Sequence, residues 1–229
     1  MIEIKNLDKS FDGNIILNNI STKFIQGKTN LIIGQSGSGK TILLKCLLGL
    51  HIPENGEIIY DGVSNKKMTD SQKTLLRREM GMVFQGSALF DSMTVLENVM
   101  FPLKMLTQKD EGEIIEKAEN AIKRVAIARA IVMNPKYLFC DEPNSGLDPK
   151  TAIIIDNLIQ EITKEYNITT IINSHDMNSV MEIGEKIIFL VNGEKNWEGT
   201  NKDIFSTENQ SITDFVYSSE LLKKVKKYL

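Results

Sequence analysis

Cysteine, tryptophan and long apolar runs are scarce in this sequence of 229 residues, which holds two cysteines and one tryptophan. Cys46 and Cys140 both stand among apolar residues, which is typical of small core side chains rather than of a disulfide or a metal site. No apolar run approaches the roughly 20 residues that a membrane-spanning helix needs, and the first residues lack the layout of a secretory signal. We therefore expect a soluble, cytoplasmic protein that reaches a membrane only through partners.

A strong excess of charge of either sign is also missing. The chain has 27 lysines and arginines against 30 aspartates and glutamates, which gives a net charge of −3 at pH 7. This balance predicts no broad basic surface, so we do not expect nucleic acid as a partner. Apolar residues make up 41% of the chain, enough for a substantial core in one large domain, or in one domain with an appended piece.

One glycine-rich stretch, Gly34-Gln35-Ser36-Gly37-Ser38-Gly39-Lys40-Thr41, fits the phosphate-binding pattern G-x-x-x-x-G-K-[ST]. The apolar residues before it predict a buried strand, and those after it predict a helix. Gly37 and Gly39 permit a backbone nest whose N–H groups face phosphate oxygens, and the helix N-terminus adds partial positive charge. Lys40 can neutralise the terminal phosphates, and the Thr41 hydroxyl can bind Mg²⁺. A chance glycine-rich turn would lack these flanks, so the stretch predicts a nucleotide site.

Alternating strand and helix patterns predict an α/β fold, a P-loop core whose parallel sheet is flanked by helices, with an antiparallel β edge. We expect strands at Met1–Ile4, Ile15–Ile20, Lys28–Ile33, Glu57–Tyr60, Met80–Phe84, Tyr137–Asp141, Ile168–Asn173, Lys186–Val191 and Lys195–Gly199. We expect helices at Ile42–Gly49, Asp70–Glu79, Thr151–Tyr166, Met177–Ile183 and Asp214–Leu229.

Residues 206–229 read as a tail behind a nucleotide-binding domain of residues 1–205. The tail begins with a polar, turn-like stretch and ends in an amphipathic, lysine-containing helix. Three interpretations stay open for that helix: a solvated terminal helix, a contact to a second subunit, or a contact to anionic lipid headgroups.

The strand at Tyr137–Asp141 delivers two carboxylates to the edge of the sheet where ligands of open α/β sheets bind. Asp141 can hold Mg²⁺, and Glu142 can polarise the water that attacks the γ-phosphate. His175 follows the next strand at the same edge, and Gln85 ends another strand, with an amide for the metal or the water. Without the glycine-rich loop, the carboxylates would be a solvated acidic turn and His175 a structural histidine.

Two further ring side chains lie outside this edge. Phe11 stands beside a turn at Asp12-Gly13, where it can stack on an adenine ring or pack within the hairpin. Its spacing leaves both interpretations open. His51 has no placement comparable to that of His175, and we expect it to be structural.

Together these stretches resemble the ATP-binding subunits of ABC transporters over nearly the whole chain. The matching segments are the Walker A motif at Gly34–Thr41, a Q-loop at Gln85, the Walker B motif at Tyr137–Asp141 with Glu142, a D-loop at Ser145–Asp148 and a switch histidine at His175. The resemblance implies ATP and Mg²⁺ as cofactors, with Thr41, Gln85 and Asp141 as metal ligands. It implies a catalytic role for Glu142 as general base, with His175 and Gln85 beside it. It also adds Phe11, as the adenine-stacking residue, and Asp148 to the nucleotide contacts.

Two segments, Phe84–Pro102 and Ser174–Met181, resemble more narrowly the Mla-type phospholipid transporter ATPases. That resemblance implies an integral-membrane permease and lipid-binding MCE-domain subunits, and the likeness to ABC transporter subunits in general implies an ATP-sandwich dimer with a second copy. It places the chain on the cytoplasmic face of the inner membrane. Amino-acid importers and cell-division ATPases share much of the pattern, so they remain alternatives.

The signature loop of the resembled family, Leu-Ser-Gly-Gly, is absent before Lys123. The residues around the junction keep a helical period, so the sequence predicts one helix over Glu111–Met133 in a shortened helical subdomain at about 86–134. In that family, the signature of one subunit completes the ATP site of the other. Either the sequence omits residues here, which the otherwise intact catalytic set favours, or the protein is an impaired ATPase. A regulatory or assembly subunit with little ATPase activity is the corresponding alternative function.

Overall fold

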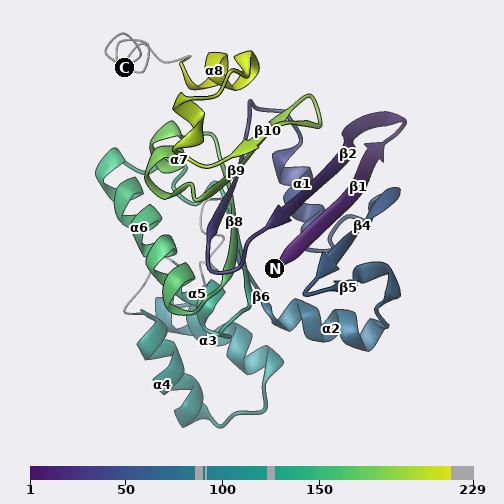
Figure 1. The fold of residues 1–229 in the computed structure, drawn as a ribbon. Coiled ribbons are helices and arrows are strands. Elements are labelled where there is room, and N and C mark those ends of the chain that lie inside the picture. Colours follow the sequence, from purple (N-terminus) through teal and green to yellow (C-terminus); the bar gives the residue numbers. More distant parts are fainter. Residues whose placement is uncertain (86–89, 91, 123–126, 218–229) are drawn as a thin grey trace.

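The computed structural model describes residues 1–85, 90, 92–122 and 127–217, which form two β-sheets with helices around them (Figure 1). The strands are β1 Ile2–Phe11, β2 Asn14–Phe24, β3 Thr29–Ile33, β4 Asn55–Tyr60, β5 Val63–Ser64, β6 Met80–Val83, β7 Tyr137–Asp141, β8 Thr169–Ser174, β9 Lys186–Val191 and β10 Glu194–Gly199. The helices are α1 Lys40–Leu47, α2 Asp70–Arg78, α3 Val95–Leu106, α4 Glu111–Ile122, α5 Ala128–Ile131, α6 Pro149–Glu165, α7 Met177–Ile183 and α8 Gln210–Val216, with short 3₁₀ turns at Asn65–Lys67 and Asp203–Phe205.

The larger sheet has the order β10-β9-β3-β8-β7-β6 within the described part of the chain. Its strands pair in parallel, except for β10, which returns antiparallel to β9. Strand β3 lies between β9 and β8, and β7 lies beyond β8. The loop that follows β3 therefore emerges at the same edge of the sheet as the ends of β8 and β7. The predicted α/β fold with a parallel P-loop sheet is therefore confirmed.

The predicted antiparallel edge forms a sheet of its own, in the order β2-β1-β4-β5. Its first hairpin turns at Asp12 and Gly13, whose φ angles of 49° and 81° suit a tight turn. Strand β1 continues well past Ile4, where the sequence predicted its end. Polar residues break the apolar alternation there, and the strand continues through register shifts on either side of Leu7.

Two apolar clusters cover the two faces of the larger sheet. Alternate residues of β7 divide between them: Phe139 faces α1 and the smaller sheet, and Leu138 faces α6, α7 and α8. Cys46 and Cys140 lie one in each cluster, which confirms them as core residues. Burial raises the pKa of the Cys46 thiol to about 11, so it stays protonated at neutral pH.

A third apolar cluster joins α3, α4 and α5 below the sheet in Figure 1. The prediction of one continuous helix over Glu111–Met133 is wrong at Ile127. This residue precedes α5 with φ −125° and ψ 6°, which are not helical angles. Helices α4 and α5 both contact α3 and contact each other, so burying their apolar sides prevails over the helical period of the sequence. Residues 123–126 lie outside the described part of the chain.

The last described helix, α8, begins at Gln210 rather than at the expected Asp214. The side chain of Asn209 caps it by accepting hydrogen bonds from the backbone N–H groups of Ser211 (3.0 Å) and Ile212 (3.2 Å). The expected helix beyond Tyr217, with its lysines, falls outside the described residues. Within the described residues, no helix is both long and apolar enough to cross a membrane.

Candidate nucleotide-binding site

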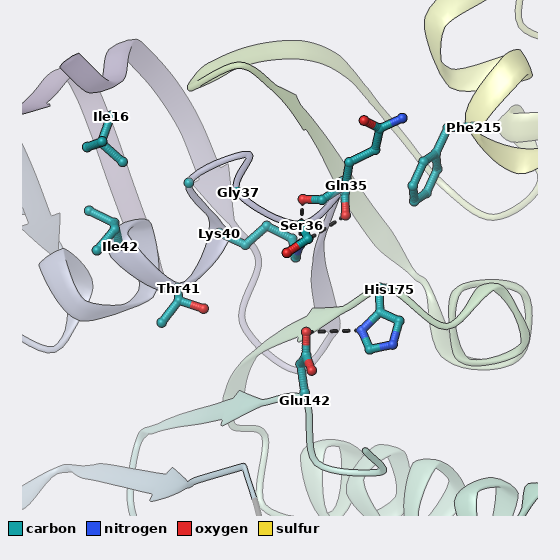
Figure 2. Close-up of a pocket in the computed structure, with 12 residues that line it drawn as sticks. Ile16, Gln35, Ser36, Gly37, Lys40, Thr41, Ile42, Glu142, His175 and Phe215 are labelled. Carbon is teal, nitrogen blue, oxygen red and sulfur yellow. Dashed lines mark hydrogen bonds and ion pairs between the residues drawn. The ribbon is translucent and has the colours of Figure 1, made fainter. Parts of the chain in front are cut away.

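The loop between β3 and α1 lines a cavity of about 650 Å³ at the carboxyl edge of the larger sheet (Figure 2). Gly37 and Gly39 have φ angles of 80° and 99°, in the left-handed region that favours glycine. A Cβ on Gly39 would lie 2.7 Å from a methyl group of Leu17, so a larger residue does not fit. The cavity is lined by Ile16, Gly34, Gln35, Ser36, Gly37, Gly39, Lys40, Thr41, Ile42, Glu142, His175 and Phe215.

Lys40 is the charged group at the floor of this loop, where its side chain is almost fully buried. Its ammonium donates hydrogen bonds to the carbonyl oxygens of Gly34 (2.9 Å) and Gln35 (3.0 Å). Burial lowers the pKa of Lys40, and the nearby carboxylates of Glu142 and Asp141 act in the opposite direction. A buried ammonium with only carbonyl partners on the loop is well placed to gain an anionic partner.

Replacing Lys40 by alanine should therefore weaken MgATP binding by at least about 100-fold. Each charge-assisted hydrogen bond contributes roughly 1.5–3 kcal/mol, and Lys40 can make more than one to phosphate oxygens. Equilibrium titration with a fluorescent ATP analogue measures the change. Lys28→Ala, which removes an exposed lysine just before β3, is the control and should bind normally. Unchanged affinity of Lys40→Ala for the ATP analogue would contradict the assignment of this loop to the nucleotide site.

Asp141 and Thr41 meet beside the loop. The Thr41 hydroxyl donates to Asp141 Oδ1 at 3.4 Å, and the Asn173 amide donates to the same oxygen at 3.0 Å. A hydroxyl and a carboxylate are oxygen ligands of the kind that Mg²⁺ prefers. Because the remaining ligands would come from phosphate and water, the donor set fits Mg²⁺, although no cluster of three acidic, histidine or cysteine residues occurs among the described residues.

Glu142 follows β7 in an unusual backbone conformation. Its φ is 49°, which is uncommon for a residue with a side chain, and its N–H donates to the carbonyl oxygen of Asn173 (3.1 Å). This conformation turns the carboxylate toward the cavity, where Oε1 lies 3.0 Å from His175 Nδ1 (Figure 2). Oε2 accepts a hydrogen bond from the Gln85 amide at 3.2 Å. Strained backbone of this kind is often found at functional sites.

Several predicted residues lie outside the cavity lining. Phe11 contacts the ring of His51 (5.2 Å between centroids) and the Lys9 ammonium (4.7 Å), and its role as the adenine-stacking residue stays a prediction. Gln85 contacts Glu142 and Ser145 rather than the metal pair. Ser38, although part of the loop, is buried and does not line the cavity.

Asp148 is the N-cap residue of α6. It caps α6 by accepting hydrogen bonds from the hydroxyl and backbone N–H of Thr151 and from the N–H of Lys150, and these bonds lower its pKa. Its role as a nucleotide contact stays a prediction.

Three cavity residues were not foreseen: Ile16, Ile42 and Phe215. Ile42 directly follows the motif, and its position alone could have indicated it. Ile16 comes from β2 and Phe215 from α8, so only the packing of those elements brings them to the cavity (Figure 2). Asn173 was also missed, although it is the register partner of Asp141 and a polar end to an apolar strand.

Residues 17–145 match the ABC transporter family. The chain is 36% identical over 243 residues to the methionine import ATP-binding protein MetN of Clostridium tetani, a match that covers 97% of this chain and 76% of MetN. It is 30% identical over 237 residues to the intermembrane phospholipid transport system ATP-binding protein MlaF of Haemophilus influenzae, covering 94% of this chain and 90% of MlaF.

A solved structure, the dimeric post-hydrolysis state of the ATP-binding cassette MJ0796 bound to ADP and Pi, superimposes with a TM-score of 0.79. The two chains are 30% identical, and the match covers 88% of this chain and 99% of that one. The MetN alignment spans 243 residues, more than the 229 residues of this chain. MetN therefore has residues within the matched region that have no counterpart here.

Proposed function

The chain belongs to the ABC transporter family of ATPases, and we propose that it is the subunit whose ATP hydrolysis drives a membrane permease. The observation that carries this proposal is the meeting of Lys40, Glu142 and His175 around one cavity, although they lie far apart in the sequence. ATP and Mg²⁺ are the ligands of this family. The glycine-rich loop and Lys40 would bind the phosphates, and the oxygens of Thr41 and Asp141 would hold Mg²⁺, with Gln85 as a further proposed ligand.

Hydrolysis needs a group that takes a proton from water, and Glu142 is our proposed general base. A carboxylate accepts up to about four hydrogen bonds, so Glu142 can receive one from His175 and one from Gln85 and still face a water. His175 faces Glu142 Oε1 with Nδ1, so an N–H on Nε2 would be available to donate to a γ-phosphate oxygen. Bound Mg²⁺ supplies charge neutralisation on the phosphate oxygens.

We further propose that two copies of this chain bind ATP between them. We also propose that a segment of the permease docks in a second, apolar cavity. This cavity of about 320 Å³ lies between β6, α3 and α5. Phe84 and Phe90, which line it, are 44% and 43% exposed, and Arg77 and Arg78 also line it. A helical segment with an apolar face and an acidic residue fits this lining. The chain would then lie on the cytoplasmic face of the inner membrane.

Phospholipid is the cargo that we propose first, because Phe84–Pro102 and Ser174–Met181 resemble the Mla-type ATPases and MlaF is among the relatives. MCE-domain subunits would then be further partners. Methionine is the second candidate, since the MetN relative has the higher identity of 36%. A regulatory subunit with little ATPase activity is the remaining alternative, and the missing signature loop is its support.

Reconstitution of the complete complex in proteoliposomes tests this function. We expect ATP-dependent movement of a fluorescent phospholipid, which Lys40→Ala abolishes. Movement of radiolabelled methionine alone would replace the proposed cargo, and movement of neither cargo together with a lack of ATP turnover would favour the regulatory alternative. The proposed docking cavity is tested in the same assay. Phe90→Ala, which removes a ring from the lining of that cavity, should lower transport without changing MgATP binding by the isolated chain. Phe205→Ala, which removes a ring of similar exposure on a 3₁₀ turn away from this cavity, should have no effect.

A further inference from the structure

A buried polar cluster lies behind the proposed catalytic pair, where α6 packs against α7. It consists of Asn144, Asp156 on α6 and Ser179 on α7. Asp156 and Ser179 are only 3% and 1% exposed, so both are desolvated. The Asn144 amide donates to Ser179 Oγ at 2.8 Å and approaches both Asp156 carboxylate oxygens at 3.4 and 3.5 Å. Buried polar groups of this kind are costly unless they hydrogen-bond to one another.

The cluster connects the two segments that carry the proposed catalytic pair. Asn144 follows Glu142 by two residues, and the loop between them is closed by a hydrogen bond from the Ser145 N–H to the Glu142 carbonyl oxygen (3.1 Å). Ser179 lies on the first turn of α7, which begins just after His175. The Asn144–Ser179 hydrogen bond therefore holds the segment after Glu142 against the helix after His175.

We propose that Asn144, supported by Asp156 and Ser179, is a positioning residue that keeps Glu142 and His175 in contact during hydrolysis. This inference rests on the proposed ATPase function. It concerns residues outside the cavity lining, which touch neither the loop nor the metal pair among the described contacts. An ionised Asp156 holds the Asn144 amide most strongly, because hydrogen bonds to a charged acceptor are roughly twice as strong as neutral ones.

The surroundings of Asp156 make its charge sensitive to pH. The pKa of Asp156 is raised to about 6, chiefly by burial and also by the carboxylates of Asp176 and Glu182 at α7, while hydrogen bonds from Ser179 and Asn144 act against this rise. From β7 it faces the thiol of Cys140, whose pKa is also raised. Because the folded state binds this proton more tightly than the unfolded chain, ionisation of Asp156 costs stability as the pH rises toward and through 6.

Asp156→Asn separates positioning from stability, because asparagine resembles the protonated carboxyl group at every pH. The variant should be at least as stable as the wild type at pH 8, since it removes a buried charge. Its single-turnover hydrolysis at pH 8, with the full chain in excess over ATP, should be about 3- to 10-fold slower, the loss expected for one hydrogen bond. The ratio of wild-type to variant rates should fall toward one as the pH falls below 6, because wild-type Asp156 becomes protonated there.

The controls are Glu161→Gln and Asn157→Ala, exposed positions on the same helix, which should match the wild type at each pH. Asn144→Ala should hydrolyse ATP slowly at every pH, and the double variant with Asp156→Asn should have the same rate as Asn144→Ala alone. MgATP affinity should stay constant in all variants. A pH-independent rate ratio for Asp156→Asn, or a loss of stability that parallels its loss of rate, would overturn the proposal.

Amide hydrogen exchange tests the positioning role without relying on ATP hydrolysis. The amides of Ser145 and Leu147 are protected by hydrogen bonds to Glu142 and Asn144. In Asp156→Asn at pH 8 they should exchange faster than in Glu161→Gln, whether or not ATP is hydrolysed. If no variant and no wild-type protein hydrolyses ATP, the proposed function fails, and this comparison still decides the positioning role. Equal exchange in the two variants would overturn it.

Discussion

Replacing Glu142 by glutamine should leave MgATP bound and slow its hydrolysis by about 10²–10⁴-fold, the usual contribution of a general base. The amide has nearly the same shape as the carboxylate but cannot accept the proton of the attacking water. Glutamine can accept from Gln85 Nε2 through its amide oxygen, and its NH2 group can donate to His175 Nδ1 in the tautomer protonated on Nε2; these atoms lie 3.2 and 3.0 Å from the Glu142 carboxylate. The substitution therefore changes proton transfer more than it changes geometry.

Two measurements check this expectation on the same protein sample. Titration with the fluorescent ATP analogue should give wild-type affinity, and single-turnover hydrolysis of γ-labelled ATP should show the slow rate. If the chain dimerises, the variant should accumulate as an ATP-bound dimer. Glu208→Gln, at an exposed position before α8, is the matched control. A normal rate for Glu142→Gln would place the base elsewhere, with His175 as the next candidate.

The residues at strand ends were predictable because one physical rule locates all of them. Parallel strands end at a common edge, so the apolar runs before Gly34, Asp141 and His175 were enough to bring these residues together. The capping role of Asp148 was also readable, since aspartate followed by proline is a helix-start signal. The motif resemblance adds a nucleotide contact for Asp148, which stays a prediction.

The residues that sequence analysis missed depend on packing between distant elements. Phe215 reaches the cavity because Ile212 and Val216 bury the other side of α8 in the sheet core. Asn144 and Asp156 meet because a helix of 17 residues folds back beside α7. No local spacing encodes such contacts. The break at Ile127 has the same origin, since it lets α4 and α5 bury their apolar sides together.

Restoring a Leu-Ser-Gly-Gly loop and its preceding helix before Lys123 should raise ATP turnover by at least about 10²–10³-fold. Removing one preorganised donor from an oxyanion-type site costs about that much, and the signature loop supplies several donors together with a helix N-terminus. MgATP binding by one chain should hardly change, because Lys40, Thr41 and Asp141 come from a single copy. The gain should exceed the effect of altering Phe11, whose ring contacts His51 and Lys9.

The matched control is an insertion of the same length in which alanines replace the serine and glycines of the loop. It separates the chemistry of the signature from a general repair of the helical subdomain. Both inserted proteins should bind MgATP like the parent chain, and only the first should hydrolyse it rapidly, with or without the membrane partners. Equal turnover by the parent and the restored protein would contradict the composite-site argument, because catalysis would then be completed by residues of this chain. Phe215 is the first of these to examine, since, like Ile16, it lines the cavity and belongs to none of the motifs.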